Sequence, residues 1–300
     1  MTSPSFLNID EVIDRFEPSH VCVVSFGPVL YRNSGYFMRC WDILEALSRK
    51  VDKITLLEFP ESGIEGKIQE CPDKISIVKL NGNKRFNNRI STQLMKLLTF
   101  DPLQNLYFQF CSFVELYRNR TFLISADLIF VEGSLIPAAN IVAKIFRKNV
   151  VLDTHSINKL LAAGFKSNKS LAYYVRNLFW HLFEKISTGL SDVVVVVSEK
   201  EKEFVIREYH IQESKIVLVP HISSMRKTNY DENDLLDLRW QLQVHDKKIV
   251  TFLGDLTAIQ NRDAAEYITK ELAPSLVKSY EDAVFLIIGR GEQQIEATAT

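Results

Sequence analysis

Short apolar runs alternate along the first 220 residues with longer segments in which apolar residues recur at helical spacing. The apolar runs predict strands at residues 20–26, 53–59, 74–80, 127–132, 150–152, 191–197 and 215–219. The periodic segments predict helices at residues 36–49, 94–120 with a break at Asp101-Pro102, 135–147, 171–189 and 200–209. Strands that alternate with helices in this way are typical of a doubly wound parallel sheet. The pattern therefore predicts an α/β fold for this part of the chain.

The pattern changes at residues 222–246, where Ser, Asn, Asp and basic residues replace the apolar runs. A strand at 248–253, a helix at 262–280 and a strand at 283–288 follow. We expect a first domain at residues 1–222, and a linker with part of a second domain at residues 223–300. Two parallel strands and one helix bury too little apolar surface to stand alone. A complete domain would need on the order of 100 further residues.

Composition narrows the class of protein. Of the 300 residues, 46% are apolar and 24% are charged, and the net charge is −1, which disfavours a dedicated nucleic-acid binder. The four cysteines form no CxxC pair and fit reduced thiols better than a disulfide framework or a zinc site. The sequence shows no secretory leader and no apolar run of transmembrane length, so we expect a cytoplasmic location.

Three polar residues follow the predicted strand at 150–152. Asp153, Thr154 and His155 would lie at its carboxyl end, which is where open α/β sheets bind their ligands. His155 is therefore the first candidate for a catalytic side chain. The alternative is that Asp153 caps a helix and His155 is an ordinary surface histidine.

The loop after the first strand is a second candidate site. Gly27 ends the strand, and Gly35 lies directly before a predicted helix, so that backbone N–H groups at the helix start could bind an anion. An ordinary loop glycine is the alternative. The loop lacks GxGxxG, which argues against an NAD-linked oxidoreductase.

A basic loop precedes the aromatic helical segment at residues 94–120. The loop holds Lys79, Lys84, Arg85 and Arg89. A basic loop beside an aromatic helix is the pattern of a peripheral contact with an anionic membrane, here the inner face. The alternative is a solvated loop and a helix that faces the core.

Four stretches together resemble a known family. Residues 191–199 (SDVVVVVSE) resemble the pattern A-D-x-V-x-x-x-S-E/K, and residues 215–221 (KIVLVPH) resemble K-I-x-V-I-P-N-G. Residues 250–274 hold VTFLG, NRDAA and LAP, which resemble F-V-G, P-N-x-D-A and I-x-P, and residues 285–291 (FLIIGRG) resemble L-x-I-V-G-x-G. In this order they resemble the retaining glycosyltransferases of the glycogen-synthase-like (group 1) superfamily.

The resemblance implies a GT-B fold of two Rossmann-like domains, the first complete and the second only partly present. It implies a hexosyltransferase that uses a nucleoside-diphosphate sugar, an acceptor glycan or lipid-linked acceptor, and no bound metal or other cofactor. Such an enzyme would act in polysaccharide or glycoconjugate synthesis. The alternative is a non-catalytic binding or scaffold protein, or one half of a split gene, without the donor site.

The resemblance also implies roles for individual residues. His155 matches a family histidine that contacts the donor sugar, and the loop from Gly27 to Gly35 would lie near the donor diphosphate. In the second domain, Gly254, Arg262 and Gly289 are expected on the nucleotide side.

Overall fold

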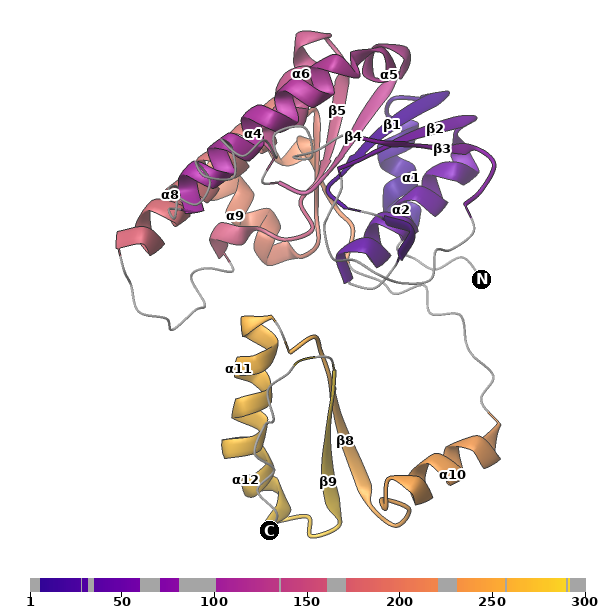
Figure 1. Cartoon of the computed structure of the whole chain (residues 1–300), viewed down its shortest axis with the longest axis vertical. Coiled ribbons are helices and arrows are strands. Elements are labelled where there is room, and N and C mark those ends of the chain that lie inside the picture. The colour runs from indigo at the N-terminus through magenta and orange to yellow at the C-terminus, as the bar shows by residue number, and fades with distance from the viewer. Residues whose placement is uncertain are drawn as a thin grey trace, which may run out of the picture. The chain divides into compact units, whose positions relative to one another are not determined.

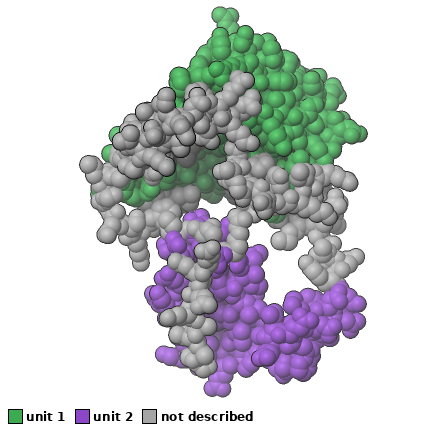
Figure 2. Space-filling view, viewed as in Figure 1, with its two compact units in different colours: residues 1–224 green, residues 225–300 purple. Residues whose placement is uncertain are grey.

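The computed structural model describes residues 6–27, 29–31, 35–59, 71–80, 101–134, 136–160, 171–220, 231–256, 258–289 and 291. The basic residues Lys84, Arg85 and Arg89, the predicted linker at 222–230 and the chain end at 292–300 lie outside these residues. The chain divides into two compact units, residues 1–224 and 225–300 (Figure 2). No helix in the described part of the chain has the length and apolar character needed to cross a membrane.

The first unit is built on a seven-stranded, fully parallel sheet, as the apolar pattern predicts (Figure 1). Its strands are β1 (His20–Ser25), β2 (Lys53–Glu58), β3 (Ile75–Lys79), β4 (Leu128–Glu132), β5 (Asn149–Asp153), β6 (Val193–Val196) and β7 (Ile216–Leu218). The strand order is β3-β2-β1-β4-β5-β6-β7. The central strands β1, β4 and β6 are buried along their whole length, which explains their nearly continuous apolar sequences.

Helices cover both faces of this sheet (Figure 1). One face packs against α1 (Phe6–Asp14) and α2 (Gly35–Lys50). The other face packs against α4 (Asp101–Arg118), α5 (Arg120–Ser125), α6 (Pro137–Ile145) and α9 (Glu199–Tyr209), with α8 (Leu171–Leu190) packed on α4, α6 and α9. The sequence pattern predicted a pair of helical segments across 94–120 with a break at Asp101-Pro102. In the described part, α4 begins at Asp101 and a new helix starts at Arg120.

Alternation along each strand divides the core into two layers. Val21 and Val23 of β1 pack with α1 and α2, whereas Cys22 and Val24 pack with α4, α5 and α6. All four side chains are fully buried. The sheet is therefore fixed from both sides, and the carboxyl ends of its strands are held in a rigid frame.

The second unit is a parallel strand pair with helices. Its elements are α10 (Glu232–Gln241), β8 (Lys248–Leu253), α11 (Ile259–Tyr267), a π-helical turn (Ile268–Leu272), α12 (Ala273–Val277) and β9 (Ala283–Ile288). Pro274 cannot donate a backbone hydrogen bond, which accounts for the irregular turn before it. Among the described residues of this unit, only Val244 and Ala265 are buried.

Candidate functional site

The centre of the sheet contains a topological switch point. From β1 the chain continues outward to β2 and β3, and from β4 it continues in the other direction to β5, β6 and β7. Neighbouring strands that lead away in opposite directions leave a crevice at their carboxyl ends, where doubly wound folds bind ligands. The residues after β1 and at the ends of β4 and β5 therefore lie where such a fold binds its ligand.

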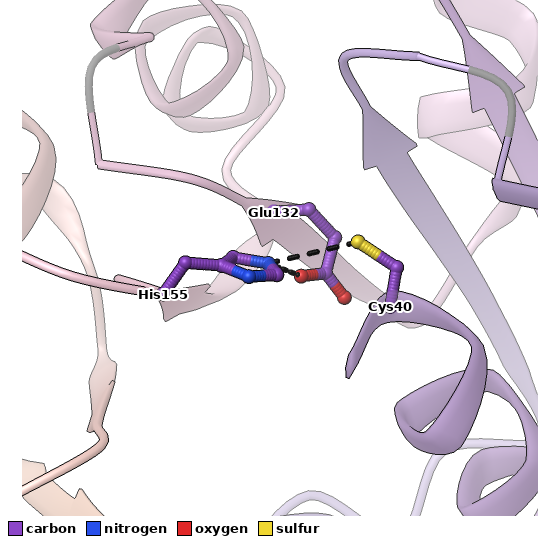
Figure 3. Close-up of side chains that lie close together, drawn as sticks. All are labelled: Cys40, Glu132 and His155. Atoms are coloured by element: carbon purple, nitrogen blue, oxygen red, sulfur yellow. Dashed lines mark hydrogen bonds and ion pairs between the residues drawn. The ribbon is translucent and has the colours of Figure 1, made fainter. Parts of the chain in front are cut away.

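Two buried carboxylates and an imidazole meet at this edge, and Figure 3 shows the imidazole of His155 beside Glu132 and Cys40. Glu132 ends β4 and Asp153 ends β5, and the two residues face each other in the strand register. The Nε2 atom of His155 lies 2.5 Å from Oε2 of Glu132 and 3.5 Å from Oδ2 of Asp153. Both carboxylates are 0% exposed and the histidine is 9% exposed, so this group is largely shielded from bulk solvent.

Arg39 of α2 completes the charge balance of the cluster. Its Nε donates to Oδ2 of Asp153 at 2.7 Å and its Nη2 donates to Oδ1 at 2.8 Å, a bidentate pair in which the arginine is 5% exposed. Its Nη1 also donates to the carbonyl oxygen of Pro220 at 3.3 Å. One guanidinium thus links α2, the end of β5 and the chain directly after β7.

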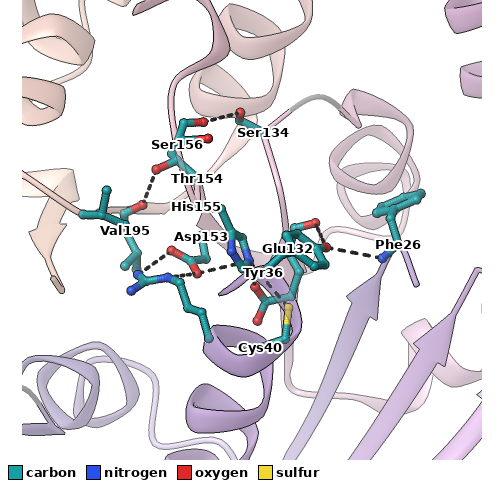
Figure 4. Close-up of polar contacts among 12 residues, drawn as sticks. Phe26, Tyr36, Cys40, Glu132, Ser134, Asp153, Thr154, His155, Ser156 and Val195 are labelled. Atoms are coloured by element: carbon teal, nitrogen blue, oxygen red, sulfur yellow. Dashed lines mark hydrogen bonds and ion pairs between the residues drawn. The ribbon is translucent and has the colours of Figure 1, made fainter. Parts of the chain in front are cut away.

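Tyr36, in the first turn of α2, connects the histidine to the switch point (Figure 4). Its ring stacks on that of His155 with a centroid distance of 4.2 Å. Its hydroxyl accepts a hydrogen bond from Phe26 N at 3.5 Å and donates one to the carbonyl oxygen of Glu132 at 3.3 Å. The tyrosine therefore bridges the ends of β1 and β4.

The electrostatics of the cluster follow from its burial. Burial raises the pKa of Glu132, and its hydrogen bond with His155 only partly offsets that rise. Burial alone would lower the pKa of His155, but the negative charges of Asp153 and Glu132 outweigh it, so the pKa is raised. In its protonated form the His155 imidazole, together with the Arg39 guanidinium, balances the two buried carboxylates.

Cys40 does not turn this cluster into a nucleophilic triad. Its sulfur lies 3.6 Å from Nε2 of His155, the same nitrogen that contacts Glu132. A triad needs the nucleophile and the acid on opposite ring nitrogens. Burial also raises the pKa of the Cys40 thiol well above its ordinary value, so the thiol stays protonated.

The same three side chains could be considered as metal ligands. Donor atoms of Cys40, Glu132 and His155 all lie within 4.8 Å of one another. A tetrahedral zinc ion would hold its nitrogen and oxygen ligands roughly 3.4 Å apart, given bonds of about 2.0–2.2 Å. The 2.5 Å separation of Nε2 and Oε2 is too short for two ligands of one zinc ion and is instead that of a short hydrogen bond. A hydrogen bond places a proton between the two atoms, whereas a metal would need a lone pair from each.

Two further carboxylates hold the loop that carries His155. The histidine has a φ of 53°, in the left-handed region that L-residues rarely adopt. Glu184 of α8 accepts hydrogen bonds from the backbone N of Asn158 at 2.6 Å and from the hydroxyl of Tyr209 at 2.6 Å. Glu201 of α9 accepts from the backbone N of Ile157 at 3.1 Å. These contacts over-determine the loop, which is how a protein maintains such a backbone conformation.

The structure brings several predicted site residues of the first unit to one edge of the sheet. His155 lies in the charged cluster, Gly27 follows β1 with a φ of 141°, and Gly35 is the first residue of α2, directly before Tyr36. The start of α2 and the imidazole are therefore close neighbours.

The remaining predicted residues lie in the second unit. Gly254 follows β8, and its backbone N donates to the carbonyl oxygen of Ile288 at 3.0 Å. A Cβ on Gly289 would lie 1.7 Å from the carbonyl oxygen of Gly254, so the two chain segments approach too closely for any side chain there. Arg262 lies in the first turn of α11 and is partly exposed.

No protein-family model and no curated protein matches the sequence. Among solved structures, HepE from Anabaena in complex with UDP and glucose has a TM-score of 0.53 and 13% identity. The alignment covers 89% of this chain and 60% of that chain. The chain has a GT-B-like fold. The fold expected from the sequence is thereby confirmed, and at this identity the likeness shows the fold alone.

Two further structures complete the comparison. HepE in complex with UDP gives a TM-score of 0.50 at 12% identity, covering 90% of this chain and 69% of that chain. UDP-GlcNAc 2-epimerase from Methanocaldococcus jannaschii gives 0.47 at 13% identity, covering 89% and 65%. The chain thus spans about three fifths of the length of the HepE chain in its UDP and glucose complex.

Sequence reasoning did not assign three members of the cluster: Arg39, Cys40 and Tyr36. The sequence signal for Glu132 and Asp153 is that each acid lies at the carboxyl end of a predicted strand. Arg39 lies between the apolar residues Phe37 and Trp41 on α2, and only the fold shows that it is buried against Asp153.

Proposed function

We propose that this chain belongs to a glycosyltransferase that moves a hexose from a nucleoside-diphosphate sugar to a hydroxyl of a glycan or lipid-linked acceptor. The observation that carries the proposal is the charged cluster at the switch point of the sheet, with the imidazole next to the start of α2. The GT-B-like fold supports it, because HepE, which has the same fold, was crystallised with UDP and glucose.

In the proposed reaction, the bond between C1 of the sugar and the diphosphate oxygen breaks. The acceptor oxygen bonds to C1 on the same face, and its proton passes to the departing diphosphate. Negative charge grows on the leaving group during this step, so positive groups placed beside it accelerate the reaction. The product keeps the anomeric configuration of the donor.

His155 and the start of α2 are the groups proposed to face this charge. The imidazolium carries a positive charge that Glu132 and Asp153 sustain, and the first N–H groups of a helix favour anions. Glu132 and Arg39 act through their partners and are positioning residues. Gly254, Arg262 and Gly289, in the second unit, are proposed as nucleotide-binding residues. In this proposal protein groups offset the diphosphate charge, so chelation of divalent ions leaves donor binding unchanged.

Calorimetric titration with a panel of UDP- and GDP-sugars tests the proposal. We expect one of them to bind, and His155→Gln to weaken that binding about tenfold, the effect of roughly 1.4 kcal/mol. His210→Gln is the matched control, because His210 is exposed and also has a left-handed backbone, with a φ of 58°. A chain that binds no nucleotide sugar would overturn the function, and binding unchanged by His155→Gln would overturn the role of the histidine.

Transfer itself needs a second measurement. With a bound donor identified, nuclear magnetic resonance of the product formed on a glycan acceptor reports its anomeric configuration, and inversion would refute the proposed stereochemistry. Binding of an acceptor glycan without any nucleotide sugar would instead favour a non-catalytic binding protein.

A further inference from the structure

Exposed apolar side chains are distributed unevenly over the first unit. Ten large apolar side chains are exposed among its described residues, and nine of them lie on the helices that cover one face of the sheet. These nine are Leu106, Phe110, Tyr117, Ile124, Ile141, Ile145, Tyr174, Leu178 and Leu182. On the helices of the opposite face, the exposed one is Met38. Such a concentration marks an interaction surface, unlike singly scattered residues.

The exposed residues form stripes on helices that pack together. On α4 they recur at positions 106, 110 and 117, on α6 at 141 and 145, and on α8 at 174, 178 and 182, which is the spacing of one helix face. The three helices contact one another (Figure 1). Phe110 and Leu178 are 60% and 62% exposed, so their rings and methyl groups are mostly in water. We call this region the α4/α6/α8 surface.

Basic side chains outnumber acidic ones around these stripes. The basic side chains on or directly after helices α4, α5, α6 and α8 are Arg118, Arg120, Lys144, Arg147, Lys148, Arg176 and Lys185. The acidic side chains described on the same helices, Glu115 and Glu184, are both buried. Asp127 accepts from the backbone of Ser19, Asp192 pairs with Lys144, and Glu115 lies 3.9 Å from Arg118. Setting these ion pairs aside, the surface keeps an excess of positive charge.

Aromatic rings and arginines are combined on this surface. The guanidinium of Arg176 lies 5.0 Å from the ring centroid of Trp180 and 5.9 Å from that of Tyr173, and both rings are partly exposed. The guanidinium of Arg120 lies 5.1 Å from the ring of Tyr117. Tyrosine and tryptophan with neighbouring cations suit the boundary between lipid headgroups and acyl chains.

We propose that the α4/α6/α8 surface docks on an anionic lipid bilayer. The apolar stripes would enter the boundary below the headgroups, and the surrounding Lys and Arg side chains would contact lipid phosphates. A second copy of this chain is a poorer occupant, because it would bring the same positive charges face to face. The proposal is independent of the nucleotide-sugar chemistry proposed above.

Co-sedimentation with vesicles tests the proposal with the full chain. We expect binding to vesicles of phosphatidylcholine mixed with phosphatidylglycerol, little binding to phosphatidylcholine alone, and release at high salt. Phe110→Ser combined with Leu178→Ser should abolish binding, and Met38→Ser is the matched control on the opposite face. Arg147→Gln combined with Lys185→Gln should weaken binding roughly 25-fold, about fivefold for each charge. Arg49→Gln on α2 is the matched charge control.

Several results would overturn the proposal. Absence of binding to anionic vesicles, equal binding to neutral vesicles, or equal losses in the control variants would each do so. Light scattering tests the alternative that the surface joins two copies of the chain. If the unmodified chain self-associates and Phe110→Ser with Leu178→Ser makes it monomeric, the surface joins two copies of the chain and not a bilayer. Circular dichroism of each variant ensures that a loss of binding is not a loss of fold.

Discussion

Replacement of Asp153 by asparagine is the sharpest test of the buried cluster. The substitution keeps the shape of the side chain but leaves the Arg39 guanidinium, which is 5% exposed, without its counter-charge. It also removes one of the two negative charges beside His155. Breaking a buried pair from one side costs about 3–5 kcal/mol. Against a total stability of about 5–15 kcal/mol, such a loss is large.

Urea unfolding followed by tryptophan fluorescence measures this cost. Trp41 is buried on α2 and Trp180 is partly buried on α8, whereas Trp240 of the second unit is already 61% exposed, so the change in signal reports mainly the first unit. The control is Glu45→Gln, which breaks an exposed pair with Arg49 on the same helix and should cost under about 0.5 kcal/mol.

A double variant separates a charge effect from a packing effect. Arg39→Met with Asp153→Leu replaces the whole pair by apolar groups, and such replacements are often neutral or stabilising. Its cost should therefore be well below the sum of the two single costs, by at least about 2 kcal/mol. The reasoning is refuted if Asp153→Asn costs under about 1 kcal/mol, or if the two single costs simply add.

Three further predictions concern other parts of the chain. Glu184→Gln should cost about 2 kcal/mol in urea unfolding, because an amide accepts fewer of the hydrogen bonds that hold the loop after β5, and an unchanged midpoint would contradict this. The raised pKa of His155 gives stability that is present below its ordinary value near 6.5 and is lost as the pH rises through the folded value. The melting temperature should therefore fall above that pH, and fall less steeply in His155→Gln; identical slopes would refute the link. Gly289→Ala should increase amide hydrogen exchange in β8 and β9, whereas Gly35→Ala, with nothing within 4 Å, should not; equal protection in both would show that the close approach is unimportant.

The order of strands and helices could be predicted from the sequence because buried parallel strands have uninterrupted apolar sequences. The five valines at 193–197 and the run at 20–26 needed no tertiary information. The first and last residues of the helices and strands were harder to predict from the sequence. The helix predicted at 262–280 begins earlier, at Ile259, and is interrupted by a π-helical turn, because local backbone geometry depends on hydrogen bonds that periodicity does not encode.

The candidate site could be predicted only in part. Acids and a histidine after strands pointed to the carboxyl edge, since that position follows from strand direction alone. The sequence did not predict the partners of these residues. Arg39 and Asp153, for example, are 114 residues apart and meet only because α2 packs on the sheet. Sequence alone also left His155 as either a surface or a site residue. The structure places its ring under Tyr36 and against Glu132, where its charge depends on its neighbours.

The wide separation of the cluster residues along the chain has a consequence for the order of events in folding. Arg39 contacts Pro220, which is 181 residues away in the sequence, and Asp153, which is 114 residues away. All strands of the sheet are parallel, so consecutive strands are joined by crossover connections. Contacts of such long range form slowly, because the chain must lose the entropy of closing a large loop before the contact can stabilise it. The guanidinium and the carboxylates stay hydrated until β1, β4 and β5 have assembled. Desolvation of these charges is therefore a late step, and the chain is expected to refold slowly, in a phase that Arg39→Met with Asp153→Leu should accelerate.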